Sequence, residues 1–178
     1  MPRVSPPEGA PAGDAIRGSA LGHQPELVEA FLRLYGILWS RGVVDHPTKE
    51  MARLRNARVT GCGYCRNVRF SVAREQGLSE AIVDEIRDGY EASDLPARDK
   101  AVLRWTDACL AQPPQATPEL RREMLRHFSP EELVELTAGI ALFLGFSKIA
   151  VSLGQAPESM PTLVVPTPDW PAEDAPAA

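Results

Sequence analysis

The stretch that decides the fold is ELVELTAGIALFLGFSKIAVSLG, residues 132–154. Its apolar residues lie on nearly every side of a helix, yet the uncharged run within it, residues 136–147, is bounded by Glu135 and Lys148. That run of about a dozen residues is shorter than the roughly 20 needed to cross a bilayer, so we expect a core helix. Because a small domain covers only part of such a helix, the stretch also predicts an oligomer.

The rest of the chain has the same helical periodicity, without alternating β-branched runs between turns. Capping residues and glycine or proline stops divide it into seven expected helices. These cover residues 25–40, 45–61, 62–76, 78–89, 97–112, 117–128 and 129–154. The chain has 178 residues and 44% hydrophobic content, which suits one core and is too little for two. The sequence therefore predicts an all-α, single-domain helical bundle.

The two ends of the chain differ from this helical region in composition. Residues 1–20 are rich in Pro, Gly and Ala and have no apolar segment, which indicates a flexible leader rather than a secretory signal. Residues 157–178 are dominated by Pro and Ala, which predicts an irregular tail and leaves 21–156 as the helical domain. The net charge of −5 argues against nucleic acid or an anionic membrane as a partner. We expect a cytoplasmic protein that binds small molecules or other proteins.

The stretch GCGYCRNVRF, residues 61–70, holds two of the three cysteines. Gly61 is expected to end one helix and the cysteine pair to open the next, where the helix N-terminus favours a thiolate. Arg69 lies four residues after Cys65, so the expected helix would place both on one face and add a cation beside the thiolate. The spacing of Cys62 and Cys65 also allows an intramolecular disulfide once one sulfur is oxidised.

Three interpretations compete for this pair. A redox dithiol needs two thiols, a setting that lowers a thiol pKa and a group that moves protons, all of which the sequence offers. A zinc site needs four ligands, which disfavours it because the other candidates are scattered singly. These are Cys109, His23, His46 and His127. The third interpretation is two small buried residues, since free cysteine is among the most buried types. The residues alone leave the first and third interpretations open.

Most of the chain, from HQPELVEAFL at residue 23 to KIAVSLG at residue 154, resembles the carboxymuconolactone decarboxylase and alkylhydroperoxidase D (AhpD-like) superfamily. Its peroxidase branch carries a glutamate, eleven residues, Cys-x-x-Cys, three residues and a histidine. Glu50, Cys62 and Cys65 occupy the first three positions here, and Arg69 stands in place of the histidine. The resemblance implies an all-α subunit that associates into dimers, trimers or hexamers.

The resemblance also implies a role for each matching residue. Cys65 would be the thiolate that attacks a peroxide, Cys62 the resolving thiol and Glu50 the general acid or base. Arg69 cannot move protons as histidine does, because a guanidinium stays charged at neutral pH. It could hold a thiolate, pair with Glu50 or bind a substrate carboxylate. No metal, flavin or haem is implied, so we expect a peroxidase or disulfide oxidoreductase that is reduced by a thiol-delivering partner.

Two alternatives to a redox enzyme remain, and each can be distinguished from it by experiment. The first is a non-redox enzyme acting on a carboxylated small molecule that Arg69 binds; it should survive the loss of Cys62. The second is a noncatalytic oligomeric redox sensor, which would stay oxidised when peroxide and a dithiol are supplied together.

Overall fold

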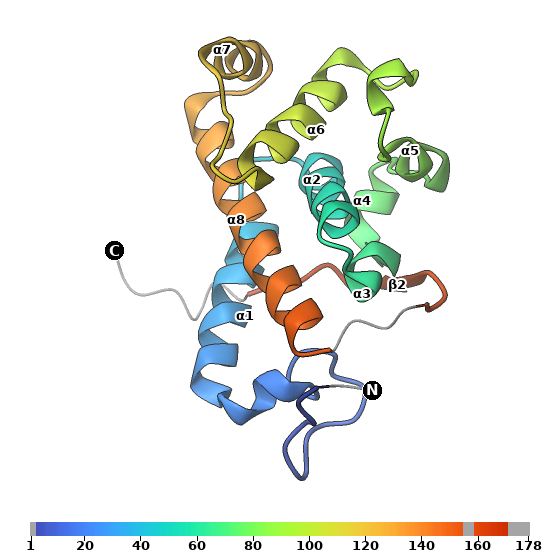
Figure 1. The fold of residues 1–178 in the computed structure, drawn as a ribbon, viewed down its shortest axis with the longest axis vertical. Helices are drawn as coiled ribbons and strands as arrows, with labels where there is room; N and C mark the ends of the chain where they lie inside the picture. Colours follow the sequence, from blue (N-terminus) through green and yellow to red (C-terminus); the bar gives the residue numbers. More distant parts are fainter. Residues whose placement is uncertain (1–2, 155–158, 171–178) are drawn as a thin grey trace.

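The computed structural model describes residues 3–154 and 159–170, and its helices confirm the all-α prediction (Figure 1). The five longest helices are α1 (Pro25–Ser40), α2 (His46–Val59), α6 (Ala97–Leu110), α7 (Pro118–His127) and α8 (Pro130–Ser152). The short helices are η1 (Ala20–His23), α3 (Gly63–Asn67), α4 (Ser71–Glu75), α5 (Glu80–Glu85) and η2 (Tyr90–Ala92). Two short strands, β1 (Val68–Phe70) and β2 (Leu163–Val165), complete the described elements.

Side-chain caps begin three of the long helices where the sequence predicts them. The Asp45 carboxylate accepts a hydrogen bond from Thr48 N at the start of α2, and Thr117 caps α7 in the same way. Ser129 and Glu132 form a reciprocal capping box at the start of α8. Each cap satisfies backbone N–H groups that have no partner within the helix, which fixes where the helix begins.

Helix α2 lies at the centre of the molecule and packs against both α6 and α8. It buries charged residues as well as apolar ones, and each buried charge has a partner of opposite sign. The pairs are Glu50–Arg53, Lys49–Glu135 and Arg55–Asp107. Because unpaired charges are costly to bury, these pairs are what allows a polar helix to occupy the centre of the fold.

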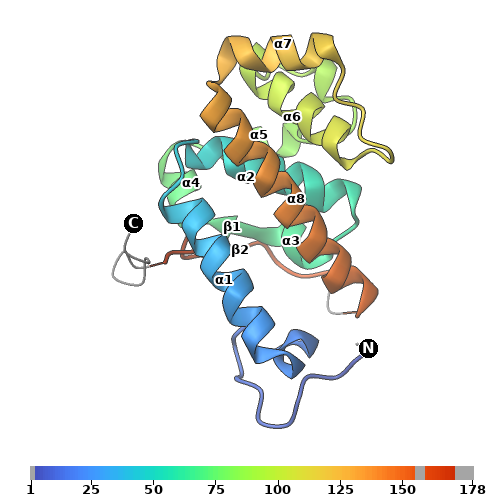
Figure 2. The same ribbon diagram turned by 90° about the vertical axis from the view of Figure 1, so that its left-hand side faces the viewer.

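Helix α8 is a core helix on one face only. That face buries six residues: Leu136, Gly139, Ile140, Phe143, Ser147 and Ala150. The opposite face is exposed, with Val134 70% exposed. Figure 2 shows α8 running diagonally across the side of the molecule turned toward the viewer. Among the described residues it is the one helix that is long and apolar enough to cross a membrane by length and composition. That a second subunit covers its outer face stays a prediction.

The helix predicted over residues 62–76 is wrong, because the chain there forms α3, β1 and α4 in succession. Two buried side chains from α2 bind the backbone of the intervening strand. Arg53 Nη2 donates to Val68 O at 2.6 Å, and Phe70 N donates to Glu50 Oε1 at 3.2 Å. These long-range bonds replace the local ones that a continuous helix would have made.

The C-terminal segment returns to the site region instead of remaining irregular throughout. Strand β2 pairs in parallel with β1, with Arg69 opposite Val164 in the register. Beyond β2, Trp170 N donates to Ser40 Oγ on α1. The predicted leader also packs on the body, since Arg3 N donates to Leu153 O. The predicted boundary between 156 and 157 lies outside the described residues, and the division into leader, domain and tail stays a prediction.

Candidate active site

A tight turn after α2 places the cysteine pair. Gly61 has a φ of +68°, a left-handed conformation that favours glycine, and Cys62 N donates back to Ala57 O at 3.0 Å. Cys62 then caps α3, with its Sγ accepting from Cys65 N at 3.3 Å. The turn and the cap together hold the two cysteines one helical turn apart and facing the same side.

Cys62 and Cys65 are joined by a disulfide whose Cα atoms lie 5.3 Å apart. Cys62 is 0% exposed and Cys65 is 7% exposed. Of the two, Cys65 lines the main cavity of the molecule. An incoming molecule in that cavity therefore reaches Cys65 first.

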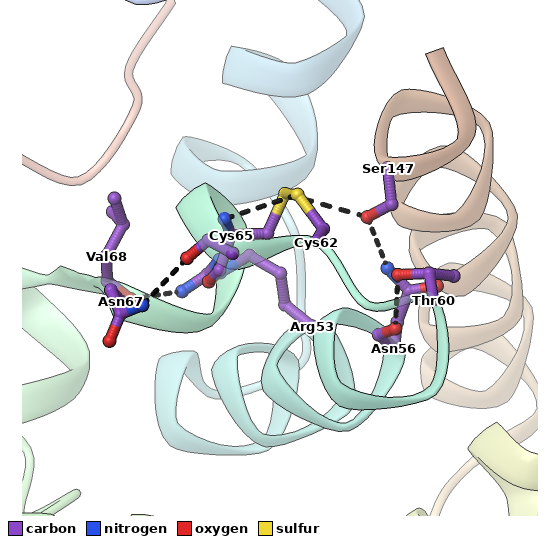
Figure 3. Close-up of a disulfide and its surroundings, with 9 residues drawn as sticks. Arg53, Asn56, Thr60, Cys62, Cys65, Asn67, Val68 and Ser147 are labelled. Carbon is purple, nitrogen blue, oxygen red and sulfur yellow. Dashed lines mark hydrogen bonds between the residues drawn. A yellow bond between two sulfur atoms is a disulfide. The ribbon is translucent and has the colours of Figure 1, made fainter. Parts of the chain in front are cut away.

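A hydrogen-bond chain from two helices ends on the disulfide (Figure 3). Asn56 Nδ2 on α2 donates to Ser147 Oγ at 2.9 Å, and Ser147 Oγ donates to Cys65 Sγ at 3.6 Å. Both polar side chains are 1% exposed. Because Asn56 donates to the Ser147 oxygen, the hydroxyl proton is directed toward the sulfur, where it would stabilise a thiolate.

Arg53 holds the backbone around Cys65. Its Nη1 donates to Cys65 O at 2.7 Å, and its Nε and Nη2 bind the two carboxylate oxygens of Glu50 at 2.7 and 2.6 Å. Glu50 is 0% exposed and Arg53 is 5% exposed. Burial alone would lower the pKa of Arg53, but the Glu50 carboxylate outweighs it and raises that pKa. Glu50 thus lies behind Arg53 rather than on the cavity wall.

Arg69 does not share a face with Cys65, because α3 ends at Asn67 and Arg69 lies in β1. Its guanidinium binds the Glu80 carboxylate, with Nη2 and Oε2 3.1 Å apart, and its Nη1 donates to Arg66 O at 2.7 Å. It does not line the main cavity. The expectation that this residue is a cation beside the thiolate is therefore wrong in its geometry.

The cavity beside Cys65 has a volume of about 710 Å³, which is the size of a site for a small organic molecule. Helices α1, α2, α3 and α8 supply eight of its 18 lining residues, and Val68 and Phe70 of β1 supply two more. Residues 13–17 and 165–168, which lie in the predicted leader and tail, supply the rest. Burial raises the pKa of Tyr35, one of its lining residues, to about 12. Burial also raises the pKa of Tyr64 on the same wall, so both hydroxyls stay protonated at neutral pH.

The structure thus brings together three of the four residues singled out in the sequence. Cys62 and Cys65 are bonded, Glu50 reaches Cys65 through Arg53, and Arg69 lies elsewhere. Arg53 and Ser147 were missed. The i, i+3 spacing of Glu50 and Arg53 on a helix was a usable signal, since such residues are neighbours on its surface. Ser147 is a single hydroxyl in an apolar stretch of helix, and the sequence gives no indication of which residue it contacts.

An all-α subunit with a Cys-x-x-Cys pair at the wall of an apolar cavity defines an AhpD-like class of protein. In agreement, residues 25–108 match the sequence model of the carboxymuconolactone decarboxylase family. An uncharacterised Mycobacterium tuberculosis protein is 36% identical over 111 residues, which make up 62% of this chain and 39% of that protein. The chain therefore spans well under half the length of this relative. The uncharacterised Bacillus subtilis protein YdfG is 23% identical over 62% of this chain and 76% of its own length.

Solved structures share the fold. A protein of unknown function from Agrobacterium tumefaciens, named after the antioxidant defence protein AhpD, matches with a TM-score of 0.66 and 25% identity, covering 76% of this chain and 92% of that chain. A peroxidase-related protein from Ralstonia eutropha JMP134 matches with a TM-score of 0.67 and 20% identity, over 79% of this chain and 75% of that one. The debrominase Bmp8 has the same fold at 20% identity and a TM-score of 0.65, over 85% of this chain and 89% of that one. The family model over residues 25–108 and the Agrobacterium structure together support a place for this chain in the carboxymuconolactone decarboxylase and AhpD-like superfamily.

Proposed function

We propose that the protein is a thiol-dependent peroxidase in which Cys65 attacks the substrate and Cys62 resolves the oxidised product. The observation that carries the proposal is the position of the pair. The two sulfurs form a disulfide, and only Cys65 lines the cavity that an organic molecule could enter. Similarity to a family and to a fold that include enzymes supports an enzyme of this kind.

The reaction proceeds in three balanced steps. The Cys65 thiolate attacks one oxygen of a hydroperoxide, the O–O bond breaks, and the leaving alkoxide takes a proton to become an alcohol. The Cys62 thiol then attacks the Cys65 sulfenic acid, so that the disulfide forms and water leaves. A dithiol reductant finally passes two electrons to the disulfide, restoring both thiols and becoming a disulfide itself.

Ser147 supports the first step by donating to the sulfur of Cys65. A hydrogen bond to the charged form of a group lowers its pKa, so this hydroxyl increases the share of thiolate at neutral pH. Arg53 supports the same step by holding the carbonyl oxygens of Cys65 and Val68. Glu50 then acts by fixing Arg53. Arg53 already binds both carboxylate oxygens of Glu50. The role of Glu50 as a proton carrier stays a prediction.

The alternative of a carboxylated substrate held by Arg69 has no observation in its favour. The Arg69 guanidinium is bound to Glu80 and lies outside the wall of the cavity. The alternative of a noncatalytic redox sensor predicts the same disulfide but no turnover. Repeated consumption of peroxide in the presence of a dithiol would distinguish the enzyme from the sensor.

The test is the rate at which the fully reduced protein reacts with an organic hydroperoxide, followed by a count of free thiols. The native chain should lose two thiols rapidly. Cys62→Ser should react once and stop at the sulfenic acid, and Cys65→Ser should react no faster than free cysteine. Cys109→Ser serves as the control, because burial raises the pKa of the Cys109 thiol and keeps it unreactive.

Two outcomes would contradict the proposal. If the native protein reacts no faster than a free thiol, the cysteine pair is not a peroxidase site. If Cys62→Ser reacts slowly and Cys65→Ser retains the fast step, the roles of the two cysteines are reversed.

A further inference from the structure

The cavity beside Cys65 has an aromatic wall. Tyr35 and Phe143 meet edge to face with ring centroids 6.2 Å apart, and Tyr35 and Phe70 meet with centroids 6.3 Å apart. Phe146, on the next turn of α8, stacks on Phe31 at 4.9 Å. Four of these five rings line the cavity directly. Aromatic rings prefer stacked or edge-to-face partners, so this wall favours a ligand that carries a ring of its own.

The two cations on the cavity wall are both neutralised by carboxylates. Arg53 is bound through two nitrogens to Glu50 inside the protein. Arg17 is bound through Nε and Nη2 to Glu29, at 2.7 and 2.9 Å, and through Nη1 to Asp14 at 3.2 Å. The two arginines and their three carboxylates, which belong to Glu50, Glu29 and Asp14, together carry one net negative charge. A ligand with a carboxylate would therefore meet no free positive charge in this cavity, and its desolvation would be uncompensated.

Arg53 has one hydrogen-bond donor left for a ligand. A guanidinium has five N–H groups, and those of Arg53 donate once from Nε, twice from Nη2 and once from Nη1. The second N–H of Nη1 therefore has no acceptor among the described residues. Arg53 and Cys65 both line the cavity, so this N–H is a polar group near Cys65 on a wall that is mainly apolar. Such a donor suits a neutral oxygen such as that of a hydroperoxide.

We infer that this cavity takes an uncharged aryl hydroperoxide, with its ring against the Tyr35, Phe143 and Phe146 wall and its oxygens between Arg53 Nη1 and Cys65 Sγ. The inference rests on the proposed peroxidase function, and it adds selection against carboxylated substrates. The selecting groups are Glu50 and Glu29, which cancel the charges that would otherwise attract a carboxylate.

The first experiment compares cumene hydroperoxide with the same molecule carrying a para-carboxylate. The reduced native protein should react at least about tenfold faster with the neutral compound, the factor that corresponds to a difference of about 1.4 kcal/mol in activation free energy. Equal or faster reaction of the carboxylated compound would overturn the inference and leave the peroxidase proposal intact.

A binding measurement separates failure of the inference from failure of the proposed function. The oxidised protein is titrated with cumyl alcohol, the product of the neutral substrate, and with its para-carboxylate, and binding is followed by NMR chemical shifts. Preference for the neutral alcohol supports the inference, whatever the rates with the hydroperoxides. If neither hydroperoxide reacts faster than free cysteine, only the peroxidase proposal is contradicted. Preference for the carboxylate would overturn the inference.

Three variants test the two parts of the selection. Phe146→Leu keeps an apolar side chain but removes the ring, and Phe146→Ala removes both. If the ring matters, Phe146→Leu should weaken the binding of cumyl alcohol several-fold; native affinity in both variants would exclude an aromatic wall. Glu29→Gln, at an exposed position, should raise the ratio of carboxylated to neutral binding several-fold by cancelling the net negative charge. An unchanged ratio would exclude charge pairing as the cause of selection.

Discussion

A single hydroxyl touches the sulfur that would react first. Ser147 Oγ donates to Cys65 Sγ at 3.6 Å, and Asn56 orients it from a second helix. In the reduced protein the same donor would stabilise the Cys65 thiolate. The reactivity of the pair is therefore expected to depend on α8, a helix far from the Cys-x-x-Cys motif in the chain.

Replacing Ser147 by Ala should raise the pKa of the Cys65 thiol in the reduced protein, because the charged form loses a donor. A hydrogen bond to a charged group contributes about 1.5–3 kcal/mol, so peroxide reaction at neutral pH should slow roughly tenfold or more. The pH dependence of alkylation by iodoacetamide would measure the shift. Thr137→Ala, which removes a hydroxyl about 15 Å away along the same helix, is the control. Equal profiles for native protein and Ser147→Ala would remove Ser147 from the site.

The buried pair of Glu50 and Arg53 gives a prediction about stability. Their side chains are 1% and 6% exposed, so Glu50→Gln leaves a guanidinium buried without its counter-charge. Breaking a buried pair in this way costs about 3–5 kcal/mol in the free energy of unfolding, which urea denaturation would measure. Glu119→Gln breaks a pair with Arg122 in which the side chains are 72% and 67% exposed. That control should cost less than about 1 kcal/mol, and an equal cost for both variants would contradict the argument.

At the scale of single residues, the motif positions could be predicted and their partners could not. The spacing of Glu50, Cys62 and Cys65 follows a local pattern that one sequence displays. Arg69 was predicted to lie beside Cys65 because both were placed on one continuous helix. That helix, α3, ends at Asn67, two residues before Arg69. Ser147 reaches Cys65 across 82 positions of sequence, and only packing of α8 against α2 brings them together.

At the scale of elements, the helices with caps and stops were predictable, and the β1–β2 pair was not. The segment Val68–Phe70 has no turn on either side and only three residues, so no periodicity distinguishes it from a helix. What makes it extended lies far away in the chain, in Glu50, Arg53 and the returning β2. Tertiary bonds outweigh local propensity there.

The close approach of the C-terminal segment to α1 yields an element-scale prediction. A Cβ at Gly36 would lie 2.7 Å from Asp169 O, a backbone atom that must then move. Gly36→Ala should therefore release residues 166–170 from α1, and hydrogen–deuterium exchange should become faster in peptides covering them. Gly145→Ala is the matched control, since nothing lies within 4 Å of its Cβ position. Unchanged exchange in Gly36→Ala would show that the segment does not depend on this contact.

At the scale of the whole molecule, two helices expose apolar faces that the described chain does not cover. On α8 this face carries Val134, Ala138, Ala141 and Ile149, which recur at helical spacing. On α1 it carries Leu27, Ala30 and Leu34, with the two leucines 59% and 52% exposed. Exposed apolar faces of this kind mark interaction sites. We propose that they are covered by further copies of this chain, as the sequence of α8 led us to expect.

Sedimentation velocity tests this proposal. The native protein should sediment as an oligomer, and Val134→Glu should shift it toward the monomer, because a charge on the apolar face would be desolvated in the interface without a partner. Val59→Glu is the control, since Val59 is 51% exposed but ends α2 and so belongs to neither face. A native monomer would contradict the proposal outright. If the oligomer dissociates with Val59→Glu but not with Val134→Glu, the interface lies at the C-terminal end of α2, beside the cysteine turn. Assembly would then control access to Cys65.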